Sequence, residues 1–169
     1  VSRDSNKKGQ EYVIMEFYEL IMKLTQSVCQ GNARAVADCF CDDGIYDDVF
    51  YGEFKGRKNI EELIDNYFYR DATDFRWDIH DPVSNGVTGY CRYIFSYKSK
   101  IKGYPETRTF FEGVAIVTIN EGLISVYREV ANTLPALERL GFSETHLSKL
   151  AAKQGREIEM RSETKAHIS

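Results

Sequence analysis

Histidine, proline and tryptophan are scarce in this chain of 169 residues, which contains three, three and one of them. The histidines, His80, His146 and His167, do not repeat a metal-binding spacing. The four cysteines form no C-x-x-C pair, so neither a zinc site nor a redox dithiol is predicted. We interpret the cysteines as free thiols in a reducing compartment, and we expect no metal and no cofactor.

Excess positive charge and long apolar runs are also missing. The formal net charge is −4, from 22 Lys and Arg against 26 Asp and Glu, which argues against a general nucleic-acid binder. No apolar run approaches the about 18–20 residues that a membrane-spanning helix needs, and residues 1–10 are too polar for a signal peptide. We therefore expect a cytoplasmic protein that binds neither nucleic acid nor membranes.

Apolar residues make up 43% of the chain, which suffices for one domain with its own core. Helical spacing covers 11–30, 33–40 and 58–69, strand-like segments cover 44–53, 75–80, 87–100, 106–119 and 123–130, and two short helices are expected after Leu134. We predict a flexible N-terminus over 1–10, one domain over 11–142, and a C-terminal helix with a flexible tail over 143–169.

This order of helices before an antiparallel meander predicts an α+β fold. The segments 87–100 and 106–119 are well beyond the usual strand length of about 5–6 residues, which favours a strongly curved antiparallel sheet. A curved sheet wrapped around helices encloses a cone, whose interior is a natural ligand site. Because these strands are apolar on both faces, we expect a homodimer that covers the outer sheet face.

The segment 44–53, G-I-Y-D-D-V-F-Y-G-E, places a carboxylate between two aromatic rings. One face of this alternating strand carries Tyr46, Asp48 and Phe50. Burial of the carboxylate is costly unless another group pairs with it, so we predict that this face is a pocket wall and that Asp48 is its reactive group. The alternative is that Asp47 and Asp48 are solvated turn residues, since aspartate is depleted in strands.

Two stretches carry a resemblance to a known family. They are G-N-A-R-A-V-A-D-C-F-C-D-D-G-I-Y-D-D at 31–48, before the meander, and E-G-L-I-S-V-Y-R-E-V at 121–130, at its end. With this order of elements, residues 11–142 resemble the nuclear transport factor 2-like (cystatin-like) superfamily. Within it they look like the SnoaL-like branch, which includes polyketide cyclases, ketosteroid isomerases and limonene-epoxide hydrolases.

The resemblance to ketosteroid isomerases concerns three positions. A general-base aspartate follows the two opening helices in those enzymes, and Asp48 stands at the matching position. Leu24 stands where that family has an oxyanion-donating tyrosine, and Ala115 stands where it has a second acid donor. The resemblance therefore implies a base at Asp48 and a substrate contact at Leu24.

The resemblance to limonene-epoxide hydrolases concerns three strands. Their last-strand W-R-D-Y segment carries a catalytic aspartate, and Y-R-E-V at 127–130 places Glu129 at that acid. Arg92 matches a catalytic arginine, with Ile94 in place of a second aspartate. The tyrosine and asparagine that hold the attacking water match Tyr46 and Asp48.

Strand alternation, apart from the resemblance, predicts which side chains converge. Three pairs each share a strand face: Tyr46 with Asp48, Arg92 with Ile94, and Tyr127 with Glu129. If all three faces line the cone, Arg92 keeps one carboxylate ionised, while desolvation raises the pKa of the other toward the range useful for proton transfer. The alternative is a buried salt bridge between Arg92 and Glu129 without a chemical role.

These patterns lead to one set of expected roles. Asp48 is the base, Glu129 the acid or second base, Arg92 their electrostatic partner and Tyr46 a hydrogen-bond donor. The expected substrate-binding residues are Phe50, Trp77, Ile94, Phe111, Tyr127 and Leu24. The predicted activity is that of a cofactor-free isomerase, cyclase, dehydratase (a lyase) or hydrolase acting on a small hydrophobic molecule.

Two alternatives to an enzyme remain open. One is a non-catalytic module of the same fold that binds a small ligand or dimerises. The other is a structural domain that docks on another protein through an aromatic sheet face formed by Tyr93, Phe95 and Tyr97.

Overall fold

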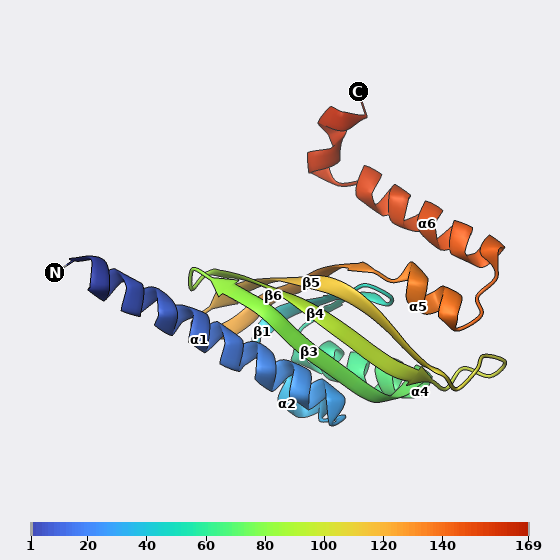
Figure 1. The fold of residues 1–169 in the computed structure, drawn as a ribbon, viewed down its shortest axis with the longest axis horizontal. Coiled ribbons are helices and arrows are strands. Elements are labelled where there is room, and N and C mark those ends of the chain that lie inside the picture. Colours follow the sequence, from blue (N-terminus) through green and yellow to red (C-terminus); the bar gives the residue numbers. More distant parts are fainter. Residues whose placement is uncertain (1, 169) are drawn as a thin grey trace.

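The computed structural model describes residues 2–168, with side chains from residue 7 onward. One six-stranded sheet dominates it, in the order β2-β1-β6-β5-β4-β3 (Figure 1). The strands are β1 (Phe40–Asp48), β2 (Gly52–Lys55), β3 (Ala72–Ser84), β4 (Thr88–Ser99), β5 (Arg108–Asn120) and β6 (Leu123–Asn132). The predicted α+β class and the antiparallel meander, β3 to β6, are confirmed.

The pairing of β1 determines where the first carboxylate lies. β1 pairs with β6 in parallel, with Tyr46 opposite Tyr127, and forms an antiparallel hairpin with β2. The sheet is therefore mixed, a detail that the sequence pattern did not specify. Parallel neighbours require a long crossover, which the helices and the meander supply here. The pairing brings the end of β1 beside the middle of β6.

The helices pack on the sheet and continue past it. They are α1 (Ser2–Cys29), α2 (Ala33–Ala37), α3 (Arg57–Glu62), the π-helical η1 (Leu63–Phe68), α4 (Tyr69–Asp71), α5 (Leu134–Arg139), α6 (Glu144–Glu159) and the 3-10 helix η2 (Ser162–His167). α1 lies along β3 (Figure 1), and its buried stripe, Phe17, Ile21, Leu24 and Val28, has the expected helical spacing. No described helix is long and apolar enough to cross a membrane.

Both ends of the chain are more helical than predicted. α1 begins at Ser2 rather than near residue 11, and α6 and η2 together span most of the segment 143–169, for which a helix with a flexible tail was predicted. Lysine, glutamine, glutamate and alanine are good helix formers, so these segments can be helical without a buried stripe. Whether the two ends are flexible stays a prediction.

β1 starts and ends earlier than predicted. It begins at Phe40, is irregular before Ile45 and ends at Asp48, and residues 49–51 form a turn into β2. Residues 40–43, which precede the predicted strand segment 44–53, therefore belong to β1. Gly44 accounts for the irregularity, because a Cβ there would lie 2.9 Å from the Phe40 Cβ and 3.0 Å from the carbonyl oxygen of Ile124.

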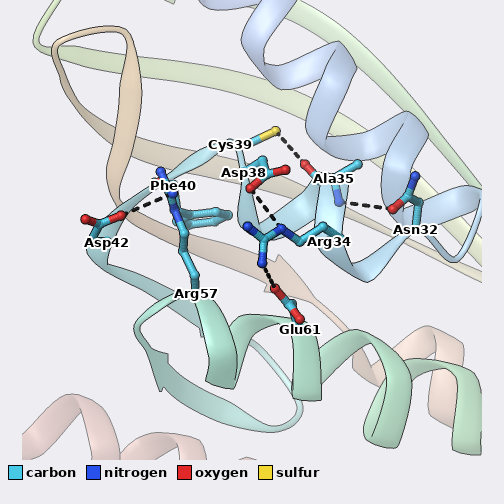
Figure 2. Close-up of polar contacts among 9 residues, drawn as sticks. All are labelled: Asn32, Arg34, Ala35, Asp38, Cys39, Phe40, Asp42, Arg57 and Glu61. Carbon is cyan, nitrogen blue, oxygen red and sulfur yellow. Dashed lines mark hydrogen bonds and ion pairs between the residues drawn. The ribbon is translucent and has the colours of Figure 1, made fainter.

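One arginine holds the start of β1, and a second joins the helices that precede and follow this strand (Figure 2). Arg57 of α3 donates to the carbonyl oxygen of Phe40 from Nε at 2.9 Å and from Nη2 at 2.7 Å, and its Nη1 lies 3.1 Å from Asp42 Oδ1. Arg34 of α2 lies 3.2 Å from Glu61 of α3. These contacts set the direction in which β1 enters the sheet.

Candidate active site

A cavity of about 230 Å³ lies between the sheet and the helices η1, α5 and α6. Most of its wall is aromatic and includes Phe50, Phe68, Phe75, Trp77, Phe95 and Phe111. Three carboxylates, Asp48, Asp71 and Glu129, also line it. The volume lies just below the roughly 300–1,000 Å³ of typical ligand pockets, so the cavity suits a small apolar molecule.

Asp48 lies at the end of β1 and is only 5% exposed. Its Oδ1 accepts hydrogen bonds from the backbone N–H groups of Phe50 and Tyr51, both at 2.9 Å. Burial raises the pKa of Asp48, and these two hydrogen bonds offset part of that effect. The alternative that Asp48 is a solvated turn residue is wrong. Its carboxylate is buried, and backbone N–H groups of the turn after β1 donate hydrogen bonds to it in place of water.

Glu129 of β6 is held by three donors. Its Oε2 accepts a hydrogen bond from the Tyr93 hydroxyl and another from the Tyr127 hydroxyl at 3.4 Å, and its Oε1 accepts one from the Val49 N–H at 3.3 Å. Burial raises the pKa of Glu129, the negative charge of Asp48 raises it further, and the hydrogen bonds partly oppose both effects.

The two carboxylates act on each other because β1 and β6 are adjacent and parallel. The register pairs Asp47 with Arg128, so Asp48 and Glu129 follow on the two strands and both face the cavity. Like charges at close range disfavour double ionisation. The pair therefore keeps one proton to a higher pH than two isolated carboxyl groups would.

Two buried donors in the cavity wall lack partners. The Tyr46 hydroxyl and the Trp77 Nε1–H have no hydrogen-bond partner among the described residues, and their residues are 0% and 9% exposed. An unpaired buried polar group costs about 1–3 kcal/mol. Both rings contact the ring of Tyr127, with centroids 4.7 and 6.4 Å away. Both donor atoms are fully buried, so an oxygen atom of a bound molecule would reach either one only after a movement of the cavity wall.

The expected convergence of Arg92 with the carboxylates is wrong. Arg92 lies on the outer face of β4, with its Nε 3.1 Å from Asp81 and its Nη1 3.0 Å from Glu112. The alternative salt bridge between Arg92 and Glu129 is wrong for the same reason. Ile94 shares the outer face and does not line the cavity. Successive residues of a strand point to opposite faces of the sheet. Because Arg92 and Ile94 point outward, their neighbours Tyr93 and Phe95 point inward.

Tyr93 is the site residue that sequence reasoning missed. It is fully buried and donates to Glu129, while Phe95 is 6% exposed and lines the cavity beside it. The alternative of an aromatic docking face is therefore wrong for these two residues. The available signal was the unbroken apolar alternation Cys91, Tyr93 and Phe95, opposite a face with Arg92 and Lys98.

The other predicted contacts divide into two groups. Phe50, Trp77 and Phe111 line the cavity. Leu24 does not: it is fully buried in the core stripe of α1, so its predicted substrate contact is wrong. Tyr127 also does not line the cavity, and its ring packs behind Tyr46.

At the other end of the cavity the wall is less buried. It includes Ile101, which is 41% exposed, and the half-buried Phe142 and Leu150. Tyr51 lines the cavity and donates to Asp71 at 2.9 Å, and Asp71 pairs with Arg70 at 2.6 Å. Within residues 2–168 no group of three or more His, Cys, Asp or Glu side chains could hold a metal ion.

Comparison with known families matches the SnoaL-like domain to residues 21–127. The chain belongs to the SnoaL-like family. The match ends before α5 and α6, which contribute Leu137 and Leu150 to the cavity wall, as does Leu140 directly after α5. A search of curated proteins found no match.

Solved structures share the fold of this SnoaL-like chain at low identity. A hypothetical protein with a ketosteroid isomerase-like fold from Catenulispora acidiphila, in complex with trimethylamine, is 17% identical, with a TM-score of 0.67 over 74% of this chain and 94% of that one. A Mycobacterium tuberculosis LEH-like epoxide hydrolase is 14% identical, with a TM-score of 0.62 over 75% and 90%. SalBIII, an epoxide hydrolase/cyclase-like enzyme in pyran ring formation in salinomycin, is 16% identical, with a TM-score of 0.59 over 70% and 92%.

Proposed function

We propose that this protein is a cofactor-free acid–base enzyme that acts on a small hydrophobic molecule bearing an oxygen atom. The observation that carries the proposal is the pair Asp48 and Glu129, which share one mainly apolar cavity and have raised pKa values. A carboxylate and a carboxylic acid side by side can remove and donate a proton near neutral pH. Among the fold's relatives are an epoxide hydrolase and an epoxide hydrolase/cyclase-like enzyme.

Asp48 is the base in this proposal and Glu129 the acid. Oδ1 of Asp48 is occupied by the two backbone donors, which orient the carboxylate at the cavity wall. The pKa of Glu129 is raised further than that of Asp48, because burial and the negative charge of Asp48 both raise it. It is therefore the member that retains the proton.

Two reactions use this arrangement. With an epoxide, Glu129 gives its proton to the oxygen as the C–O bond breaks, water attacks the carbon, and Asp48 takes a proton from that water; the proton then returns to Glu129. With a β,γ-unsaturated ketone, Asp48 removes a proton from the carbon beside the carbonyl and returns it at the γ-carbon. In that case the protonated Glu129 donates a hydrogen bond to the developing oxyanion.

The test uses Asp48→Asn, which keeps the shape and removes the charge. Turnover of a terpenoid epoxide, followed as diol formation, and of a β,γ-unsaturated ketone, followed by the absorbance of its conjugated product, should fall about 10²- to 10⁴-fold. Asp47→Asn is the matched control, because it makes the same change on the other face of β1. Equal turnover in wild type and Asp48→Asn would contradict the proposal.

The alternative function is a non-catalytic ligand-binding module. The mainly aromatic wall of the cavity is as suitable for holding an apolar ligand as for reacting with it. Native mass spectrometry of the purified protein separates the two. A co-purified ligand that stays chemically unchanged, and that Asp48→Asn also retains, would favour the binding module.

We also propose a homodimer through the outer sheet face. This face carries Val114 of β5 directly opposite Val130 of β6, at 39% and 62% exposure. Tyr90 and Phe110 add further exposed apolar area at 44% and 52%. An apolar surface of this kind on an antiparallel sheet is typical of an interface, and a symmetric partner covers it with the same residues.

A further inference from the structure

A second hollow, the α6 groove, lies beside α6. Its volume is about 540 Å³, and its wall consists of Tyr104, Phe142, His146, Lys149, Leu150, Ala152, Lys153 and Arg156. Seven of these eight residues belong to α6 or the segment just before it, and Tyr104 comes from the loop at 100–107. Of these eight, Tyr104 lies within residues 21–127, which the SnoaL-like family model matches, and the other seven lie beyond them.

The α6 groove adjoins the open end of the cavity. Phe142 and Leu150 line both hollows. Phe142 stacks on Tyr104 with ring centroids 4.6 Å apart, which fixes the wall between the loop and α6. A ligand with an apolar part in the cavity could therefore extend past Leu150 into the α6 groove without crossing a core element.

Positive charge gathers in the α6 groove, although the chain as a whole is acidic. Lys149, Lys153 and Arg156 are spaced four and three residues apart, so they share one face of α6 over about 10 Å. Lys153 lies 3.6 Å from Glu157. Lys149 and Arg156 have no ion pair within residues 7–168. Two cations are thus available to an anionic group.

We propose that the α6 groove binds the phosphate group of a phosphate ester whose apolar chain fills the cavity; this rests on the proposed function, since both concern one ligand. Phosphate suits the basic residues Lys149, Lys153 and Arg156, because it accepts several charge-assisted hydrogen bonds and matches the planar fork of the arginine guanidinium group. The ligand then has three parts: a phosphate at α6, an apolar chain along the aromatic wall, and an oxygen-bearing end near Asp48 and Glu129.

A membrane surface is the main rival for a basic amphipathic helix. Leu150, the leucine of α6 in the groove wall, also lines the cavity and is half-buried there, so it is not free to enter a bilayer. The α6 groove is also concave, and a concave site encloses a single head group better than it fits the flat surface of a bilayer. These two observations favour a small amphipathic anion.

Trp77 makes the binding measurable without knowledge of the substrate. It is the chain's single tryptophan and lines the cavity, so its fluorescence reports occupancy. Octyl phosphate, octanoate and octanol share one apolar chain and differ in the head group. We expect octyl phosphate to bind wild type about tenfold more tightly than octanol, with a smaller ratio at high salt. Octanoate should lie between the two.

The decisive variant is the double substitution Lys149→Ala and Arg156→Ala. It should abolish the preference for octyl phosphate and leave the octanol affinity unchanged, because neither residue lines the cavity. The matched control is Lys58→Ala with Lys165→Ala, two exposed lysines outside the α6 groove, which should keep the full preference.

Equal affinities for octyl phosphate and octanol in wild type would overturn the proposal, as would a preference that survives in the double variant. Binding of wild type to phosphatidylserine vesicles, without discrimination between the two octyl ligands, would assign α6 to a membrane surface instead. Asp48→Asn should retain the octyl phosphate preference. Loss of turnover and loss of head-group recognition are therefore measured separately.

Discussion

The hydroxyl of Tyr93 on β4 donates a hydrogen bond to the carboxyl group of Glu129 on β6, across the intervening strand β5. Gly113 of β5 makes this possible, since a Cβ there would lie 2.5 Å from Cζ of Tyr93. The absence of a side chain on β5 lets the tyrosine reach over it. One acid of the candidate site is thus held by a residue two strands away.

Tyr93→Phe tests this hydrogen bond. Because the Tyr93 hydroxyl lowers the pKa of Glu129 and burial raises it, its removal should raise the pKa of Glu129 further. The unfolding free energy at high pH should fall by about 1.5–3 kcal/mol, the range for hydrogen bonds to charged groups. Chemical denaturation measures it. Tyr97→Phe, on the same face of β4, is the control and should have a smaller effect.

Gly113→Ala tests the close approach. The added methyl would also lie 2.9 Å from the Ala131 Cβ, so neither neighbour can move away freely. We expect a loss of about 1–3 kcal/mol of stability from overpacking, together with displacement of Tyr93 from Glu129. Thermal denaturation measures the first effect. An unchanged melting temperature would mean that Tyr93 does not lie over this glycine.

Stability should fall as pH rises through the region where the two carboxyl groups ionise. Folding raises their pKa values, so the folded protein binds more protons than the unfolded chain, between about 3.8 and about 6 through Asp48 and between about 4.5 and about 8 through Glu129. Each pH unit in these windows should cost about 1.4 kcal/mol per group that remains protonated. Glu129→Gln should flatten the dependence, whereas Glu112→Gln, on the exposed outer face, should not.

Val114→Asp tests the proposed dimer. A charge opposite Val130 in the middle of the outer sheet face would be desolvated in a symmetric interface. Light scattering should show a dimer for wild type and a monomer for the variant. Val87→Asp, at an exposed turn, is the control and should remain dimeric. A monomeric wild type would contradict the interface.

Strand alternation predicted part of the candidate site and misled in another part. The pairs Tyr46 with Asp48 and Tyr127 with Glu129 do share the inner side of their strands. Alternation defines two faces but does not say which one is inner, and on β4 both faces carry apolar residues. The inward placement of Arg92 depended on the assumption that its face of the strand lines the cone, against the apolar pattern that includes Tyr93.

The turn at 49–51 shows a second limit of sequence patterns. Val49, Phe50 and Tyr51 have high strand propensity, so continuation of the strand was the natural prediction. The strand ends at Asp48 instead. The Asp48 side chain accepts hydrogen bonds from the N–H groups of Phe50 and Tyr51, and these hydrogen bonds bend the chain toward β2. A local side-chain hydrogen bond here outweighs the propensity of three residues.

The central claim is that Asp48 and Glu129 interact as a pair in a mainly apolar cavity, and carboxyl ¹³C NMR titration tests it most directly. In wild type, both groups should titrate above the ordinary values of their side chains, with Glu129 the higher. In Asp48→Asn, the pKa of Glu129 should fall, because the charge that raises it is gone. Titration of both groups at ordinary values, or no change at Glu129 in Asp48→Asn, would contradict the claim.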